Sequence, residues 1–446
     1  MIKMKLLTNI ISFFFKSEED QRRLYKVVIP SFIIHFFAGI LLAILTFVIP
    51  RGLGSRQYGI YAYSYSIIYI IVSLATYGLC ILAIRESSSL LSKNQKGLWK
   101  GLHKWSVKLI LLICVAFAAI VAIFITVSTF YTHLLKETPY TIPLLLALVT
   151  VPFYGLMNYY SGALRGQHKV VLSLLPDNIV KPVFFLLTIG TVFVLSGTLD
   201  VQKAIFANIV AFALAALFSI ILFYKTTELK TINPEYDTKS WKKALKSFFL
   251  LTVILSINSK MDILMLGYLK DSSQVGIYDA ADRIAASVMV FLMIMNQVSA
   301  ASISRLHSLG QKQKLQEMIT KTSRWVFIIS LPLYAIIILF RKWIMGYCGA
   351  DFEEGQTALI IIATGQIINL AYGPVGNFAL MTGNQKFNII FVAINIFINI
   401  SLNLILTPTM GITGTAIATT CALITWNTGM FFTIRKKTGI NTWILG

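Results

Sequence analysis

The chain has 446 residues, a net charge of +21 at pH 7, 57% apolar residues and only 13% charged residues. Soluble domains carry about 25% charged residues, so this composition excludes a soluble globular enzyme and predicts a protein whose main solvent is the lipid bilayer. It also excludes a nucleic-acid-binding domain, because the basic residues lie in short loops rather than on one soluble face beside stacking aromatic side chains.

The N-terminal segment, residues 1–26, is apolar from Leu6 to Phe15 and then acidic at Glu18, Glu19 and Asp20. A secretory signal peptide would place a small-residue cleavage site there instead. We therefore expect an interfacial amphipathic helix that leads into the first membrane span.

Apolar runs of about twenty residues follow along the rest of the chain, and a helix of that length crosses roughly 30 Å of hydrocarbon at 1.5 Å per residue. They predict an all-α polytopic membrane protein with about twelve transmembrane helices. The predicted spans are 27–50, 58–82, 105–127, 139–164, 170–195, 204–224, 247–269, 276–300, 324–349, 355–380, 387–407 and 411–434.

The connections between these spans alternate in charge. One side of the membrane holds 28 Lys and Arg residues and the other side holds seven. Positive loops stay in the cytoplasm, so this asymmetry predicts that the 28 residues face the cytoplasm. The basic side comprises both termini and the loops at 83–104, 165–169, 225–246, 301–324 and 386.

A short repeat recurs at an offset of 217 residues (274 − 57). The motif Gln-x-Gly-Ile-Tyr occurs at 57–61 and again at 274–278. At the same offset, Gly166 and Lys169 match Gly383 and Lys386, and Asn178 matches Asn395. Chance explains one such match, but it is a poor explanation for three at one offset.

Each copy of the repeat holds six spans, so both halves would insert with the same orientation, related by a pseudo-twofold axis along the membrane normal. This predicts two six-helix lobes that face each other across a central cleft. The expected parts are the N-terminal lobe 27–224, a cytoplasmic linker 225–246, the C-terminal lobe 247–434 and a cytoplasmic tail 435–446.

Motifs for catalysis and nucleotide hydrolysis are missing from the sequence. It has no G-x-x-x-x-G-K-[ST], no H-E-x-x-H, no G-x-S-x-G and no clustered metal ligands among its five histidines. We therefore expect no enzyme activity, no cofactor and no metal site. Transport is the function that remains.

Ionisable residues inside spans are costly in lipid and mark functional positions or partnered charges. The candidates that lie clear of the loops are Asp177, Lys181, Lys260, Asp262, Asp282 and Arg283, with His35 as a further titratable group.

Lys181 follows Asp177 by one helical turn, so the two can meet on one face, and Pro182 removes the backbone donor for the carbonyl of Asn178. The pair is either a neutral element that stabilises a kink or a lumen cation for an anionic head group.

Lys260 and Asp262 lie two residues apart and point in different directions, so each needs another partner. Arg283 can pair with Asp279, either as a structural ion pair or as a gate. His35 is either a packing residue or a lumen residue.

Tyr61, Tyr65 and Tyr69 form an i, i+4, i+8 stripe on the second span. Aromatic residues near span ends usually form the interfacial belt. A tyrosine stripe that runs inward could also stack on sugar rings.

Several segments, in their order and spacing, resemble the Wzx-type polysaccharide flippases of the multidrug/oligosaccharidyl-lipid/polysaccharide exporter superfamily. The likeness covers nearly the whole chain. The segments are GSRQYGIY (54–61), GLCILAIR (78–85), ALRG (163–166), Lys181-Pro182, MDILMLG (261–267), GIYDAADRI (276–284) and NLILTPTMGITGTAIAT (403–419).

The resemblance implies a V-shaped, two-lobed exporter in the bacterial inner membrane. Such a protein moves a polyprenyl-diphosphate-linked oligosaccharide to the outer leaflet for O-antigen or capsule synthesis. A polymerase and a chain-length regulator are the partners that the resemblance implies. A cationic lumen would bind the diphosphate. The candidate cations are His35, Arg85, Lys181, Lys260 and Arg283, and the acidic residues Asp177, Asp262 and Asp282 could serve ion coupling.

Three alternatives stay open. Multidrug cation antiporters of the superfamily often carry an acidic residue in the first span, where this chain has His35. Lipid II flippases have more spans than are predicted here. A membrane-embedded glycosyltransferase or polymerase would have a large extramembrane loop, whereas the longest outer connection, around Asp351 to Glu354, is short.

Overall fold

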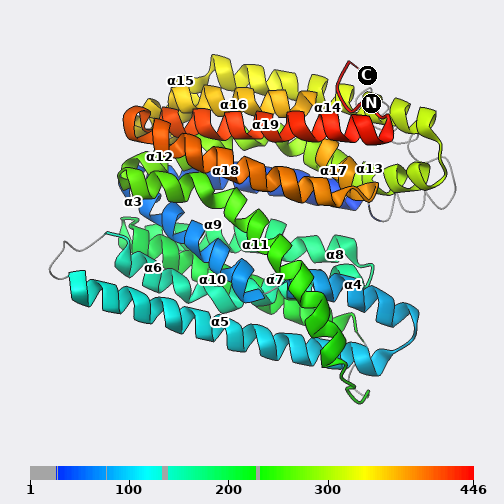
Figure 1. The fold of residues 1–446 in the computed structure, drawn as a ribbon. Coiled ribbons are helices and arrows are strands. Elements are labelled where there is room, and N and C mark those ends of the chain that lie inside the picture. The colour runs from blue at the N-terminus through cyan, green and yellow to red at the C-terminus, as the bar shows by residue number, and fades with distance from the viewer. Residues whose placement is uncertain (1–26, 28, 77, 133–138, 228–231, 446) are drawn as a thin grey trace. The chain divides into compact units, whose positions relative to one another are not determined.

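The computed structural model describes residues 27–445 except 28, 77, 133–138 and 228–231, so the predicted interfacial segment 1–26 lies outside the described residues. The described residues form helices joined by short loops, with no β-strand among them (Figure 1). The predicted all-α membrane fold is therefore confirmed.

Each predicted span has a helical counterpart in the described chain. Eight helices are long and apolar enough to cross a membrane, and two bent pairs, 141–166 and 350–381, pass the same test together. Helix α3 (Ile29–Thr76) contains two predicted spans, because its backbone leaves the helical conformation at Gly54 (φ 73°, ψ 166°). Helices α12 (Ser272–Ala286) and α13 (Val290–Ser308) cover the eighth predicted span.

The chain divides into two compact units, which we call the 40–276 unit and the 277–445 unit; the second also contains α3 up to Gly39. Helix α11 lies in the 40–276 unit, although it was predicted to open the second lobe. The pseudo-twofold relation between lobes stays a prediction.

In the 40–276 unit, α7 packs against α10, α4 and α5, and α9 packs against α10. Met157 of α7 and Phe212, Ala215 and Ala216 of α10 form a buried apolar cluster. Besides part of α3, the unit contains α4 (Leu79–Ser92), α5 (Lys96–Thr132), α6 (Thr141–Leu148), α7 (Thr150–Gly166), α8 (Val170–Leu175), the π-helix η2 (Pro176–Val180), α9 (Lys181–Ser196), α10 (Val201–Lys225) and α11 (Thr238–Leu269).

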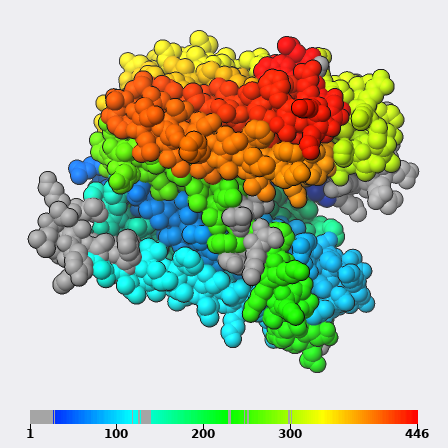
Figure 2. Space-filling model, viewed as in Figure 1, coloured from blue at the N-terminus to red at the C-terminus, as the bar shows by residue number. Residues whose placement is uncertain are grey.

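In the 277–445 unit, α19 packs along α18 and α16, and α14 packs against α16 and α13. Figure 2 shows α18 and α19, coloured orange to red, covering one face of this unit. Its remaining helices are the 3₁₀ turn η3 (Ser287–Met289), α14 (Lys312–Leu339), α15 (Arg341–Cys348), η4 (Ala350–Gly355), α16 (Gln356–Ala371), α17 (Val375–Met381), α18 (Gln385–Met410) and α19 (Ile412–Thr438).

Large apolar side chains point outward on many of these helices. Val194 and Leu195 at the end of α9 are each 81% exposed, and Phe397 on α18 is 72% exposed. In water such surfaces would drive aggregation, whereas lipid tails solvate them without cost. The exposed apolar faces therefore fit a bilayer environment.

Two predicted spans end differently in the structure. The second span was predicted to run to residue 82, but α3 ends at Thr76 and α4 begins after Gly78, whose left-handed backbone (φ 75°) interrupts the helix. The ninth was predicted over 324–349, but α14 begins at Lys312 and ends at Leu339. The polar pair Arg341 and Lys342 then opens the separate helix α15.

The predicted linker 225–246 is partly helical, because α11 begins at Thr238. Its extended part is bound to α5: the amide of Glu235 donates to the Gly97 carbonyl (3.0 Å), and Lys100 Nζ donates to the Ile232 carbonyl (2.7 Å). A Cβ at Gly101 would lie 1.7 Å from the Glu235 carbonyl oxygen, so only glycine lets the linker approach this closely.

The predicted tail 435–446 continues α19 to Thr438 and then folds back onto α14. The side chain of Gln316 makes two hydrogen bonds of 2.7 Å with the backbone of Asn441, and Ser323 donates to the Thr442 carbonyl (2.9 Å). The tail is therefore a structured part of the 277–445 unit.

Candidate functional site

The fifth predicted span is interrupted at membrane depth by the π-helix η2 between α8 and α9. Pro182 has no backbone donor, so the carbonyl of Asn178 loses its normal α-helical partner, and the wider π-turn relieves this conflict. Within this turn, Lys181 Nζ lies 2.6 Å from Asp177 Oδ1, as the one-turn spacing predicted. The Lys181 side chain is 25% exposed and that of Asp177 is 50% exposed, so the pair stays accessible.

Lys181 also lies above an aromatic ring of a neighbouring helix. Its Nζ is 5.1 Å from the centroid of the Phe212 ring on α10. An ammonium group over a ring face is attracted by the negative potential of that face. The lysine therefore has two partners, a carboxylate on its own helix and a ring on α10.

Three rings from three helices continue from this contact. The Phe212 ring centroid lies 4.6 Å from that of Tyr154 on α7, and Tyr154 lies 6.4 Å from Tyr69 on α3. At the other end, Lys260 Nζ on α11 lies 5.7 Å from the Tyr69 centroid. We call Tyr69, Tyr154 and Phe212 the aromatic row. The structure thus brings two predicted site lysines to opposite ends of one row of rings.

The rest of the tyrosine stripe lies differently. Tyr61 is only 5% exposed, and its hydroxyl accepts a hydrogen bond from Asn208 Nδ2 (2.6 Å). The Tyr65 hydroxyl lies 3.4 Å from Thr150 Oγ1. Tyr61 and Tyr65 therefore pack between helices, and Tyr69 is the member of the stripe that joins the aromatic row.

Two further predicted site residues of the 40–276 unit, Arg85 and Asp262, are not part of the aromatic row. Arg85 Nη2 lies 2.5 Å from Glu86 Oε1, and its guanidinium lies 5.2 Å from the Phe248 ring centroid, which ties α4 to α11. Asp262 is half-buried on α11. Neither residue contributes a ring or an ammonium group to the aromatic row.

The remaining predicted residues belong to the 277–445 unit. Arg283 Nε lies 2.6 Å from Asp279 Oδ2, and this carboxylate side chain is 3% exposed, so the predicted pairing is confirmed and neutralises a buried charge. His35 Nδ1 donates to the Ser31 carbonyl (2.7 Å). Asp282 is half-buried on α12.

A buried ladder of uncharged polar groups on α18 was not predicted. Asn403 Nδ2 donates to Asn399 Oδ1 (3.1 Å), Thr407 Oγ1 donates to Asn403 Oδ1 (2.8 Å), and Thr407 Oγ1 lies 3.0 Å from Thr415 Oγ1 on α19. We call these four residues the amide ladder. Hydrogen bonds between neutral side chains hold membrane helices together. The spacing of four residues between Asn395, Asn399 and Asn403 was the signal in the sequence.

Comparison with known proteins assigns the chain to a family. A family described as "Polysaccharide biosynthesis protein" matches residues 24–307, which is more than half of the chain. This chain belongs to that family. The related MatE family also matches residues 248–405.

Two curated relatives come from the archaeon Haloferax volcanii. One, "Probable low-salt glycan biosynthesis flippase Agl15", is 25% identical over 50% of this chain and 48% of its own length. The other, "Probable flippase AglR", is 22% identical over 61% of this chain and 56% of its own length. The chain thus matches about half the length of these relatives.

Solved structures share the fold. A multidrug resistance MATE family transporter of the MOP superfamily, in an inward-facing conformation, has 15% identity and a TM-score of 0.75 over 91% of this chain and 94% of that chain. The lipid II flippase MurJ, inward closed, has 18% identity and a TM-score of 0.68 over 92% and 87% of the two chains. A MOP superfamily transporter from Pyrococcus furiosus has 13% identity and a TM-score of 0.69 over 96% and 98%.

Proposed function

We propose that this protein is a flippase that moves a lipid-linked oligosaccharide across the membrane by alternating access. The observation that carries the proposal is the aromatic row with Lys181 at one end and Lys260 at the other, on membrane helices of a polysaccharide biosynthesis family member. The row combines the two chemistries that such a substrate needs.

The lysines would neutralise the phosphate groups of the substrate. A phosphate group in a cavity of lowered dielectric constant needs a cation or several hydrogen-bond donors nearby. Asp177 already balances Lys181, so a phosphate at this end would compete with the carboxylate for the ammonium group. Such an exchange lets the site bind its substrate and release it again.

The exposed edges of the row would contact sugar rings. Tyr69 and Tyr154 are half-buried rather than fully buried, so part of each ring stays accessible. Arg283, His35 and Arg85 lie outside the aromatic row, and we propose that they also contact the phosphate groups of the substrate. The polyprenyl chain would stay in the lipid.

Two curated relatives named as flippases, one of them in glycan biosynthesis, support a glycan cargo over a drug cation or lipid II. The cationic ends of the row support an anionic lipid carrier. The finer expectations stay proposals: O-antigen or capsule as the destination, the bacterial inner membrane with cytoplasmic termini, and a polymerase or chain-length regulator as partners.

The test is genetic and chemical. Deleting the gene should cause a lipid-linked oligosaccharide to accumulate in the cytoplasmic leaflet, and the wild-type chain should clear it. The double variant Lys181→Ala/Lys260→Ala should not clear it, whereas Lys239→Ala/Lys243→Ala, which removes two exposed lysines of α11, should act like wild type. Full clearance by the first variant would refute the role of the row.

A further inference from the structure

Residues 55–59, at the start of the first motif copy, touch residues 272–276, at the start of the second, and all of them belong to the 40–276 unit. A Cβ atom at Gly59 of α3 would lie 1.6 Å from the carbonyl oxygen of Ser272, and a Cβ at Gly276 of α12 would lie 2.2 Å from the carbonyl oxygen of Ser55. Any side chain larger than hydrogen would therefore push the helices apart. We call this backbone contact the glycine crossing.

The glycine crossing is reciprocal. Ser55 and Ser272 are 217 residues apart, the same offset that separates Gly59 from Gly276. The first glycine therefore contacts the serine of the second copy, and the second glycine contacts the serine of the first copy. The two equivalent glycines also face each other, because a Cβ at Gly59 would lie 2.9 Å from the Gly276 nitrogen and a Cβ at Gly276 would lie 2.9 Å from the Gly59 nitrogen. In a twofold arrangement, a contact between equivalent residues lies on the axis. The crossing is therefore the place where the predicted pseudo-twofold axis would pass.

A contact on this axis has a consequence for transport. In transporters built from repeats related by an axis along the membrane normal, the substrate site lies at the repeat interface and alternating access moves one repeat against the other. Residues 51–57 and 270–275 belong to connections on the side with few positive charges, which is the predicted outer side. A backbone contact there would close the outer end of the path.

We propose that the glycine crossing is the outer gate, closed in this structure, and that it must separate once in each transport cycle. This inference rests on the proposed flippase function. The Ser273 hydroxyl donates to the Ser55 hydroxyl (2.8 Å) across the crossing and links the two motif copies in the closed state.

The helices on both sides can bend beside the crossing. Gly54, immediately before Ser55, has a non-helical backbone (φ 73°, ψ 166°), and α11 ends at Leu269, three residues before Ser272. Movement at these two breaks would separate the motif copies without unwinding either helix. The side chains that pack within each repeat would stay in place.

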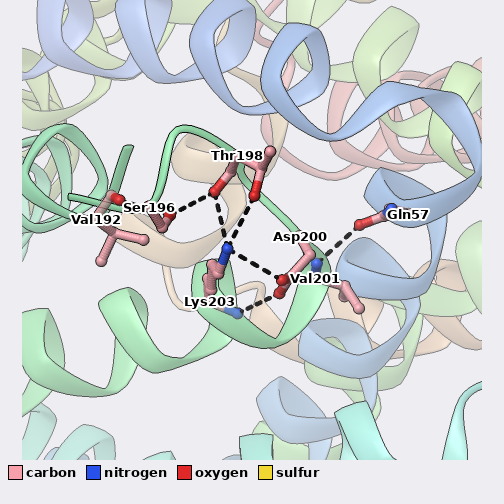
Figure 3. Close-up of polar contacts among 7 residues, drawn as sticks. All are labelled: Gln57, Val192, Ser196, Thr198, Asp200, Val201 and Lys203. Carbon is pink, nitrogen blue, oxygen red and sulfur yellow. Dashed lines mark hydrogen bonds and ion pairs between the residues drawn. The ribbon is translucent and has the colours of Figure 1, made fainter. Parts of the chain in front are cut away.

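A disulfide across the crossing tests the gate. In a chain whose four native cysteines are replaced, Ser55→Cys/Ser273→Cys places two thiols where the hydroxyls now make a hydrogen bond. The control is Gln57→Cys/Val201→Cys, joined by a short bifunctional thiol reagent. Gln57 Oε1 accepts from the Val201 amide (2.9 Å) inside one repeat copy (Figure 3).

The control contact is expected to stay closed throughout the cycle. Figure 3 shows the loop between α9 and α10 held by Lys203, which bonds to the Thr198 carbonyl (3.1 Å) and hydroxyl (3.0 Å) and lies 3.5 Å from Asp200. Asp200 also accepts from the Lys203 amide and caps α10. Linking Gln57→Cys to Val201→Cys should therefore leave clearance of the lipid-linked oligosaccharide unchanged.

Oxidised Ser55→Cys/Ser273→Cys should lose clearance of the lipid-linked oligosaccharide and regain it when a reductant opens the disulfide. Clearance at the wild-type rate by the fully cross-linked chain would overturn the gate. Failure of the pair to link, with oxidant or with the short reagent, would overturn the crossing itself. If the reduced variant and the wild type both fail to clear the substrate, the proposed function is wrong instead.

A second variant probes the closed state without a cross-link. Gly59→Ala on the Ser55→Cys/Ser273→Cys background adds the Cβ that meets the Ser272 carbonyl, so the gate should no longer close and disulfide formation should be lost. Gly190→Ala, where a Cβ meets no atom within 4 Å, should leave disulfide formation intact. Equal cross-linking of both variants would contradict the proposal.

Discussion

The fifth span of the chain and helix α18 are counterparts in the predicted repeat, since Asn178 and Asn395 are separated by the repeat offset. The fifth span has a π-turn and an accessible ion pair, Asp177 with Lys181. Helix α18 instead carries the uncharged amide ladder, in which Asn403 and Thr407 are fully buried. The two helices therefore differ in their polar groups: one keeps an accessible ion pair, and the other is hydrogen-bonded to its neighbour α19.

The difference has a physical reason. Burying a charge within the membrane costs free energy, so a charge is retained where its interaction with a substrate or an ion offsets that cost. Neutral amide and hydroxyl groups instead form hydrogen bonds with each other between two helices. The anion chemistry of this protein is thus expected to lie in the 40–276 unit, at the ends of the aromatic row.

Lys181→Ala should abolish clearance of the lipid-linked oligosaccharide, because it removes a cation from one end of the aromatic row. Lys181→Arg keeps the charge and should retain most of the activity. Both are measured as the amount of lipid-linked oligosaccharide in the cytoplasmic leaflet, at matched protein levels. Normal clearance by the alanine variant would remove the fifth span from the transport site.

Asp177→Asn should reduce clearance less than Lys181→Ala does, because Lys181 keeps its charge and loses only a competing carboxylate. The variant should respond to collapse of the proton and sodium gradients as the wild type does. Complete loss of transport in Asp177→Asn, with the protein folded, would instead assign ion coupling to this carboxylate.

Asn403→Leu should lower the stability of the protein by about 1–3 kcal/mol, since Thr407 and Asn399 lose buried hydrogen-bond partners. The measurement is the midpoint of thermal unfolding in detergent. Transport per folded molecule should stay at the wild-type level. A folded Asn403→Leu protein without transport activity would show that α18 also carries transport chemistry.

Tyr61→Phe should have the smallest effect. It removes the hydroxyl that accepts from buried Asn208, at a cost of about 1 kcal/mol, and leaves the ring packing intact. Tyr69→Ala is the matched comparison, because it removes a ring of the aromatic row and should impair clearance more strongly. Equal effects of the two changes on clearance would mean that the tyrosine stripe acts as a whole.

The sequence predicted features that depend on local spacing. The all-α membrane fold follows from apolar run length, and the described part of the chain has eight helices and two bent pairs that could cross a membrane. The pairs Asp177–Lys181 and Asp279–Arg283 follow from the one-turn spacing of helices. Pro182 predicted a disturbed turn in the fifth span, although not that the disturbance is a π-helix.

Features that depend on packing between distant segments were missed. Phe212 is an ordinary apolar residue in its own span, and nothing local to it indicates that Lys181 lies over its ring. The glycine crossing likewise forms only because two segments 217 residues apart touch each other. The repeat in the sequence predicted that these segments correspond to each other, but not that they are in contact. The end of α14 at Leu339 was missed because apolar residues resume at Trp343, directly after the polar pair Arg341 and Lys342.

The most direct measurement is translocation by the purified protein in liposomes that contain the lipid-linked oligosaccharide extracted from the deletion strain. We expect the wild-type chain to move this lipid between leaflets, and we expect Lys181→Ala/Lys260→Ala, equally folded, to leave it in place. Equal translocation by both proteins would contradict a transport site built on the lysines and the aromatic row.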